Sequence, residues 1–185
     1  PVPRKEGYEF KGWSLTRNIE PLLGNLWNKD DDGNLIIDGT ENEVSTFVPD
    51  IDSIFPLYRT MNFTIYGKGH LKFDFEYKVG KVPSSNSNNL KAGGAYRIYK
   101  GDILIKSEEA PMPSSWSDGG TFFMDMELEP GDYKIVFEGY QDYYASVGQT
   151  GTIKNLKITD DELLSSIKKG RKGNLQLKAK WEVEK

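Results

Sequence analysis

The sequence predicts a mainly β chain, organised as a β-sandwich with a small β-rich domain and one short helix near the C-terminus. The first observation is a regular alternation of apolar and polar residues, which is typical of half-buried strands. It recurs in three segments, whose apolar positions are Leu71, Phe73, Phe75 and Tyr77; Phe122, Met124, Met126 and Leu128; and Tyr133, Ile135 and Phe137. The second observation is a turn signal, Pro130 and Gly131, between two of them. Strands at such spacing favour a sandwich.

The pattern divides the chain into three parts. Residues 1–61 contain short apolar bursts separated by Gly, Asn and Asp, and we expect them to form the small β-rich domain. Residues 62–159 carry the longer alternating strands of the sandwich. Residues 160–185 contain the helix and a closing strand that can complete the small domain.

The helix is predicted by its end signals. Thr159 and Glu162 have the spacing of a capping box, and Gly170 can end the helix in the left-handed conformation. After it comes the longest period-2 run in the chain, with apolar positions at Leu175, Leu177, Ala179, Trp181 and Val183. We therefore predict a helix close to 159–170, then a strand in which Trp181 is buried.

Composition excludes several functional classes. The 185 residues include no cysteine, which removes disulfides, thiolate catalysis and cysteine-based zinc sites. The net charge of −4 argues against nucleic acid or anionic lipid as a partner. No apolar run approaches the ~20 residues of a membrane helix, so we expect no membrane insertion in this segment. The chain begins at Pro1 without a leader, and we expect it to be part of a longer polypeptide.

Two stretches that end in tryptophan carry a family resemblance. The first contains Pro3, Arg4, Glu6, Gly7, Tyr8, Phe10, Gly12 and Trp13, and the second is Leu177, Lys178, Ala179, Lys180 and Trp181. They resemble the opening and closing signatures of the Listeria/Bacteroides repeat, the internalin B-type repeat of bacterial secreted and wall-attached proteins. Two arrangements are possible. In the first, one repeat is interrupted by the sandwich. In the second, a degenerate repeat whose closing signature is only echoed by Leu57, Tyr58 and Arg59 is followed by the closing half of a second repeat. The resemblance implies an extracellular or cell-wall-attached bacterial protein.

Three segments of the sandwich, 67–73, 130–135 and 151–158, carry a second resemblance. They are similar to the opening, later and closing strands of jelly-roll modules in bacterial surface proteins and glycan-active enzymes, with Tyr133 where that pattern has His. The resemblance implies a module that binds sugars or packs against neighbouring domains. A fold alone does not assign either task.

No catalytic motif supplies a reaction. His70, the only histidine, lies on the polar side of a predicted strand without a nucleophile elbow, and we interpret it as a solvated surface residue. Asp74 and Glu76 alternate with apolar residues, which favours a solvent face over a catalytic pair. We therefore expect the segment not to be an enzyme.

A calcium loop is one chemical possibility. Asn28, Asp30 and Asp32 alternate as oxygen donors before Gly33, with Asp38 as a further acidic residue. However, Gly39 stands where a bidentate Glu is expected, and Asp38 is one position short. The alternative is an ordinary hairpin turn between Trp27 and Leu35. We expect no obligatory cofactor.

An aromatic loop is the candidate ligand site. Tyr140, Tyr143 and Tyr144 follow a predicted strand among polar residues, and flat rings beside hydrogen-bonding groups suit pyranose sugars. Trp116 could extend this platform or close the edge of the sandwich, and one or two of the tyrosines could instead cap its core.

Together these features predict a non-catalytic adhesion, binding or spacer segment, monomeric, with a glycan or a protein at a cell surface as its partner. The alternative is a carbohydrate-binding accessory module of a polysaccharide-degrading enzyme. A third possibility, a glycan hydrolase, requires two carboxylates that face each other in a cleft.

Overall fold

The computed structural model describes residues 2–38, 55–78, 80–81, 90–91, 94–111, 119–141, 149–165 and 176–185. These residues form strands, turns and short connections, and none of them is helical. In this part of the chain, no helix is long and apolar enough to cross a membrane.

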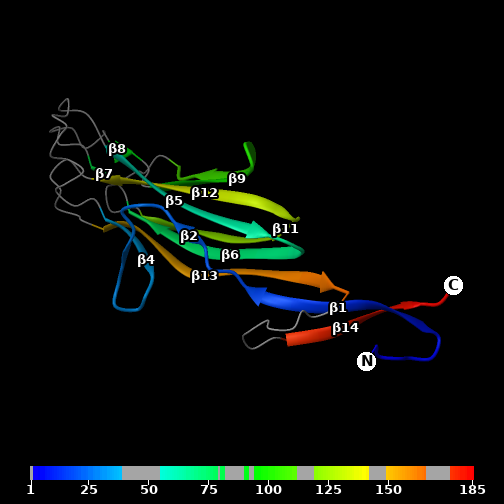
Figure 1. Ribbon diagram of the computed structural model, residues 1–185. Helices are drawn as coiled ribbons and strands as arrows, with labels where there is room; N and C mark the ends of the chain where they lie inside the picture. Colours follow the sequence, from blue (N-terminus) through cyan, green and yellow to red (C-terminus); the bar gives the residue numbers. More distant parts are fainter. Residues whose placement is uncertain are drawn as a thin grey trace.

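Two antiparallel sheets lie face to face (Figure 1). The larger sheet has seven strands, with the order β11-β6-β13-β1-β14, and β4 and β3 join it beside β13. Its strands are β1 (Tyr8–Asn18), β3 (Asn28–Lys29), β4 (Leu35–Asp38), β6 (Lys68–Tyr77), β11 (Gly120–Leu128), β13 (Gln149–Leu164) and β14 (Gln176–Val183). The prediction of a mainly β chain with a sandwich is confirmed.

The second sheet has five strands in the order β10-β9-β12-β5-β2. Its strands are β2 (Leu22–Leu23), β5 (Phe55–Ile65), β9 (Gly94–Lys100), β10 (Ile103–Glu109) and β12 (Gly131–Gln141). A separate two-stranded ribbon pairs β7 (Gly80–Lys81) with β8 (Leu90–Lys91).

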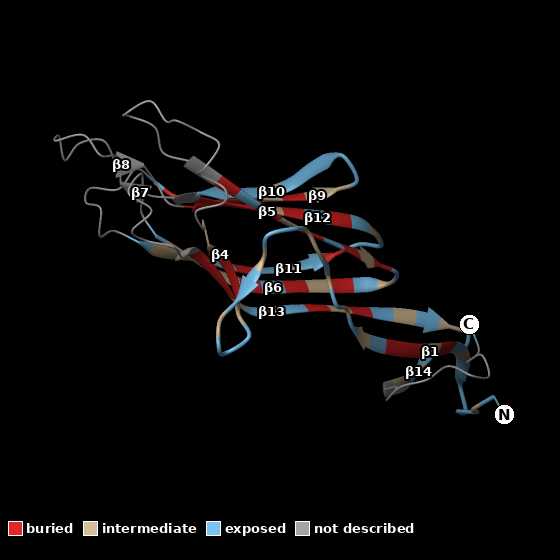
Figure 2. Cartoon of the chain, turned by 60° about the vertical axis from the view of Figure 1, so that its left-hand side comes forward, coloured by how far each residue is buried: buried red, intermediate tan, exposed pale blue. Residues whose placement is uncertain are grey.

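The core lies between the two sheets, where buried residues face one another (Figure 2). Alternation along β6 buries Leu71, Phe73 and Phe75, as the sequence predicts. Phe137 of the opposite sheet packs edge-on against two of these rings, at centroid distances of 5.1 Å to Phe73 and 5.4 Å to Phe75. Each such side chain contributes roughly 1.5–3 kcal/mol through burial, so this period-2 pattern accounts for the two-layer arrangement.

A three-stranded blade, made of β1, β14 and the C-terminal end of β13, projects beyond the sandwich (Figures 1 and 2). On it, Phe10 packs edge-on against Trp13 at 5.3 Å and against Trp181 at 5.5 Å. Trp181 is half-buried, so the prediction of full burial is wrong. The reason is that the described strands of the blade form a single layer with no second sheet packed on it (Figure 1), and Phe10, Trp13 and Trp181 are all only partly buried.

The same blade brings the two tryptophan-ending stretches together. Phe10 pairs with Trp181 and Trp13 with Ala179 in antiparallel register. Residues 57–59 lie instead in β5 of the other sheet. The resemblance to the internalin B-type repeat and the three-domain division stay predictions, although strands of the first and third predicted domains share one sheet.

The predicted helix close to 159–170 is wrong over its first half, because residues 159–164 continue strand β13. All of residues 159–164 pair with β1, and residues 159–161 also pair with β6 on the other side, for example through Thr159 to Asn18 and to His70. A cap contributes about 1 kcal/mol. The six cross-strand pairs that residues 159–164 form with β1, at roughly 0.2–1 kcal/mol each, exceed it. Residues 166–170 lie outside the described part of the chain.

Candidate functional site

A hollow of about 430 Å³ lies at the end of the sandwich next to the point where β1 ends. We call it the Tyr66 hollow. It is formed by the connection between β1 and β2, the end of β5 and the start of β12. Its lining residues are Ile19, Glu20, Leu22, Asn62, Phe63, Thr64, Tyr66, Asp132 and Tyr133.

Tyr66 supplies an aromatic wall. Its side chain is 62% exposed although the residue directly follows a core strand. The guanidinium carbon of Arg17 lies 4.7 Å from the ring centroid, a cation–π contact. The backbone N–H of Tyr66 also donates to Asp160 Oδ2 at 2.8 Å. Both the ring and its backbone are therefore fixed before any ligand arrives.

Asp160 is the anchor of this arrangement. Its side chain is fully buried and accepts two hydrogen bonds from Arg17, Nε to Oδ1 at 2.9 Å and Nη2 to Oδ2 at 2.6 Å. Burial by itself raises the pKa of Asp160, but hydrogen bonds from Arg17 and from the N–H groups of Tyr66 and Gly67 outweigh it and lower the pKa below its ordinary value. The carboxylate therefore stays ionised.

Gly67 allows the β5–β6 turn to approach β13 this closely. A Cβ atom at Gly67 would lie 1.6 Å from the carbonyl oxygen of Asp161, which no side chain can tolerate. The absence of a side chain at this turn therefore brings Tyr66 within reach of Asp160.

The floor of the hollow is aromatic. Phe63 and Tyr133 are buried and stack with an interplanar angle of 11° and a centroid distance of 5.5 Å. The hydroxyl of Tyr133 donates to the backbone oxygen of Glu129 at 2.6 Å, and burial raises its pKa, so it remains neutral. The strands thus give the hollow a rigid base.

The rim is polar. Thr64 Oγ1 donates to Asp132 Oδ1 at 2.7 Å, which orients that carboxylate across the two neighbouring strands. Asn62 and Glu20 are exposed, and the exposed Leu22 pairs with Asn62 from β2. Acceptors and an amide donor therefore surround one accessible aromatic ring.

The predicted tyrosine site is mostly outside the described residues. Tyr143, Tyr144 and Trp116 fall there, and of Tyr140 only the strand position is described, in β12 opposite Pro56. That site stays a prediction. The backbone position of Tyr140 lies at the other end of β12 from Asp132.

Sequence reasoning missed Tyr66, whose only local signal is an aromatic residue beside a turn glycine. It could not bring Glu20, Tyr66 and Asp132 together, because they come from three distant segments.

The predicted calcium loop is a closed hairpin between β3 and β4. Asp30 Oδ1 accepts the N–H groups of Asp32 at 3.0 Å and Asn34 at 2.8 Å, while Asn34 Nδ2 donates to Oδ2 at 2.9 Å. The side-chain bond from Asn34, followed by the backbone bonds, lowers the pKa of Asp30. Gly33 has a φ of +82°, as the turn requires. The hairpin alternative is thus confirmed.

A metal role for Asn28, Asp30, Asp32 and Asp38 stays a prediction. Asp38 lies at the far end of β4 from the turn. Over the described residues, no group of three or more His, Cys, Asp or Glu residues could hold a metal ion.

His70 lies on the outer face of β6 and is half-exposed, as predicted for a surface histidine. Its Nε2 contacts the Asp125 carboxylate of neighbouring β11. Asp74 and Glu76 share that face, where Asn155 Nδ2 donates to Asp74 at 2.7 Å and Lys154 pairs with Glu76 at 2.6 Å. These two carboxylates belong to a solvent-facing charge network rather than to a catalytic pair.

No protein-family model matches the chain, and no curated protein does. Solved structures of carbohydrate-binding modules show a distant likeness. A family 35 module from an environmental isolate is 11% identical with a TM-score of 0.32, covering 78% of this chain and 86% of that one. The C-terminal family 6 module of a laminarinase from Zobellia galactanivorans is 14% identical with a TM-score of 0.30, covering 78% and 97%.

A third similar structure is a family 35 module in complex with a glucuronic acid-containing disaccharide. It is 10% identical with a TM-score of 0.31, and the match covers 90% of this chain and 99% of that one. At these TM-scores the likeness carries no argument about this chain, so the function must be argued from its own surface.

Proposed function

We propose that this chain is a non-catalytic carbohydrate-binding module whose binding site is the Tyr66 hollow. The observation that carries the proposal is the exposed Tyr66 ring, fixed by Arg17 within a hollow that has a polar rim. We place the module outside the cell, as an accessory part of a polysaccharide-degrading enzyme whose catalytic domain lies elsewhere in the polypeptide.

The chemistry fits a pyranose ring. One face of a sugar presents C–H groups that pack on an aromatic ring, with a contribution on the order of 1 kcal/mol, while its hydroxyls need donors and acceptors at the edge. Asp132 and Glu20 supply acceptors, and Asn62 supplies both donor and acceptor. Because Tyr66 and Asp132 are already oriented, binding costs little further ordering.

Binding is better supported than hydrolysis. Glu20 and Asp132 both line the hollow, but both are exposed. A glycosidase needs an acid kept in an apolar, water-poor setting so that it holds its proton. A spacer or a protein-binding adhesin does not require a rigid aromatic hollow, so this feature favours sugar binding over those two functions.

The test is a glycan array with the parent chain, followed by calorimetric titration of the positive glycans. Tyr66→Ala is expected to weaken binding at least tenfold, while Phe123→Ala, which removes a 77% exposed ring from the outer face of the other sheet, is expected to leave it unchanged. A Tyr143→Ala/Tyr144→Ala variant tests the competing loop site. Loss of glycan binding in the double variant but not in Tyr66→Ala would place the binding site in the tyrosine loop. Absence of glycan binding by the parent chain would overturn the proposal.

A further inference from the structure

A second exposed aromatic ring lies on the same face of the same sheet as the rim of the Tyr66 hollow. Along β5, burial alternates: Leu57, Met61 and Phe63 face the core, while Tyr58, Thr60, Asn62 and Thr64 form the outer face. Asn62 and Thr64 belong to the hollow, and Tyr58 is 54% exposed at the other end of this row. Thr64 is six positions along the strand from Tyr58, a distance of roughly 20 Å.

Tyr58 is accompanied by a fixed donor and a fixed acceptor. It lies directly opposite Glu138 of β12. Glu138 is 5% exposed, and its Oε2 accepts a hydrogen bond from Arg97 Nη1 at 2.8 Å. Arg97 is half-buried and comes from the next strand, β9, so the pair is held by two neighbouring strands. An exposed ring thus lies beside a fixed ion pair, as Tyr66 lies beside the Arg17–Asp160 pair.

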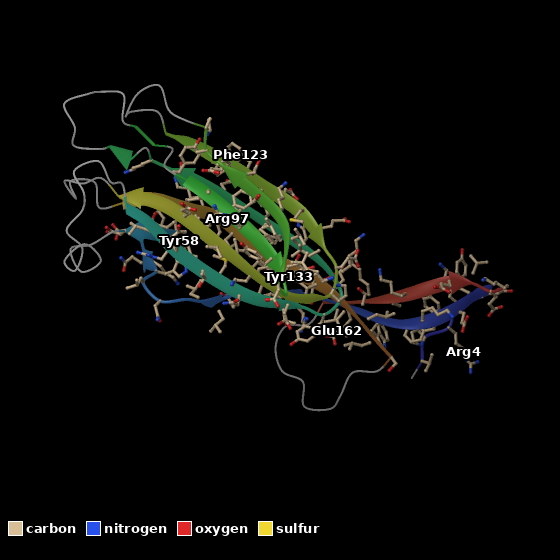
Figure 3. The ribbon with its side chains drawn as sticks, turned by 90° about the horizontal axis from the view of Figure 1, so that it is seen from above. Arg4, Tyr58, Arg97, Phe123, Tyr133 and Glu162 are labelled. Atoms are coloured by element: carbon tan, nitrogen blue, oxygen red, sulfur yellow. The ribbon has the colours of Figure 1, made fainter. Side chains whose placement is uncertain are left out.

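Polar side chains connect the two places. Asn62 lies opposite Lys134 on the outer face, and the Lys134 ammonium lies 5.4 Å above the centroid of the Tyr99 ring. In the view onto this sheet, Tyr58 and Arg97 lie near each other, and Tyr133, whose buried ring forms the floor of the hollow, marks the end of the sheet where the hollow lies (Figure 3). The outer face thus carries aromatic and hydrogen-bonding groups over much of the length of β5.

We infer that the ligand is an extended glycan chain, which lies along the outer face of the five-stranded sheet with one unit in the Tyr66 hollow and another on Tyr58. The inference rests on the proposed function, which it deepens by specifying a chain rather than a single terminal sugar. A chain that reaches both rings gains a second contact without a second association step, so its affinity exceeds that of a short fragment.

The test uses β-1,4- and β-1,3-linked glucan, xylan and mannan oligosaccharides of two and six units, titrated into the parent and three variants by calorimetry. The six-unit ligand is expected to bind at least tenfold more tightly than the two-unit ligand of the same linkage. Tyr58→Ala is expected to weaken the long ligand about tenfold and leave the short one unchanged. Tyr66→Ala is expected to weaken the binding of both ligands, and Phe123→Ala is expected to change the binding of neither ligand. Thermal unfolding of every variant checks the fold.

The outcomes separate the two proposals. Equal affinity for short and long ligands, together with no effect of Tyr58→Ala, would overturn the extended-chain inference and leave the binding function intact. A parent chain that binds no oligosaccharide of either length, and no glycan on the array, would overturn the binding function and the inference with it.

Discussion

Arg17 and Asp160 lie 143 positions apart in the sequence and form a two-pronged salt bridge at the point where β1 leaves the sandwich. The carboxylate is fully buried, whereas the arginine side chain is 26% exposed and packs over the Tyr66 ring. One ion pair thus connects the sandwich, the blade and the wall of the proposed binding site.

Removing the charge of Asp160 should destabilise the protein. In Asp160→Asn the guanidinium of Arg17 loses its closer anionic partner in a mostly buried setting and keeps only the longer, 3.9 Å pair with Glu162. We expect the free energy of unfolding to fall by about 2–3 kcal/mol. Because Arg17 is partly hydrated, this is less than a fully buried pair would lose. Urea unfolding measures the change. The matched control is Lys11→Ala, which breaks an exposed pair with Glu9 and should cost less than about 1 kcal/mol. Equal losses in the two variants would contradict the role of the buried pair.

The same pair predicts an acid dependence of stability. The pKa of Asp160 is lower in the folded state than in the unfolded chain, so the unfolded state binds the proton more readily. The contribution of this carboxylate is therefore complete above about pH 4, the unfolded value, and is lost as the pH falls through the folded value. Urea unfolding between pH 2 and pH 6 should show a steeper loss for the parent than for Asp160→Asn. Parallel curves would contradict the assignment.

Gly67 should be intolerant of any side chain. In Gly67→Ala the new Cβ collides with the backbone of β13, so we expect at least about 3 kcal/mol of destabilisation, together with weaker glycan binding because the Tyr66 turn must move. Gly33→Ala is the comparison, since a Cβ there meets nothing within 4 Å and only the positive φ costs about 1–2 kcal/mol. The thermal midpoints of both variants give the ranking, and a Gly67 variant as stable as the parent would refute the close approach.

Asp132 should contribute hydrogen bonding rather than folding. Its carboxylate is exposed, so Asp132→Ala is expected to weaken glycan binding three- to tenfold while the thermal midpoint changes little. Asp125→Ala, on the outer face of the other sheet, serves as the control and should leave affinity unchanged. Calorimetric titration of an array-positive glycan measures both. Unchanged affinity in Asp132→Ala would remove this carboxylate from the site.

The sequence by itself determined the strands that form the core. The alternation in β6, β11 and β12 comes from residues two positions apart, and a strand places such residues on one face whatever it pairs with. The turn at Asp30 to Asn34 is equally local, because its hydrogen bonds close within five residues. For these elements the physical cause lies inside the segment, so a sequence pattern is enough.

Only the tertiary structure decided the rest. Residues 159–164 carry helix signals, but β1 pairs with all of them and β6 with residues 159–161, and both strands are distant in sequence. The Tyr66 hollow likewise depends on segments that are distant in the sequence and meet only in the folded chain. Long-range contacts decide which strands pair and where a turn lies above a neighbouring strand. Their free energy exceeds a local preference of about 1 kcal/mol, and they produce no periodic pattern in the sequence.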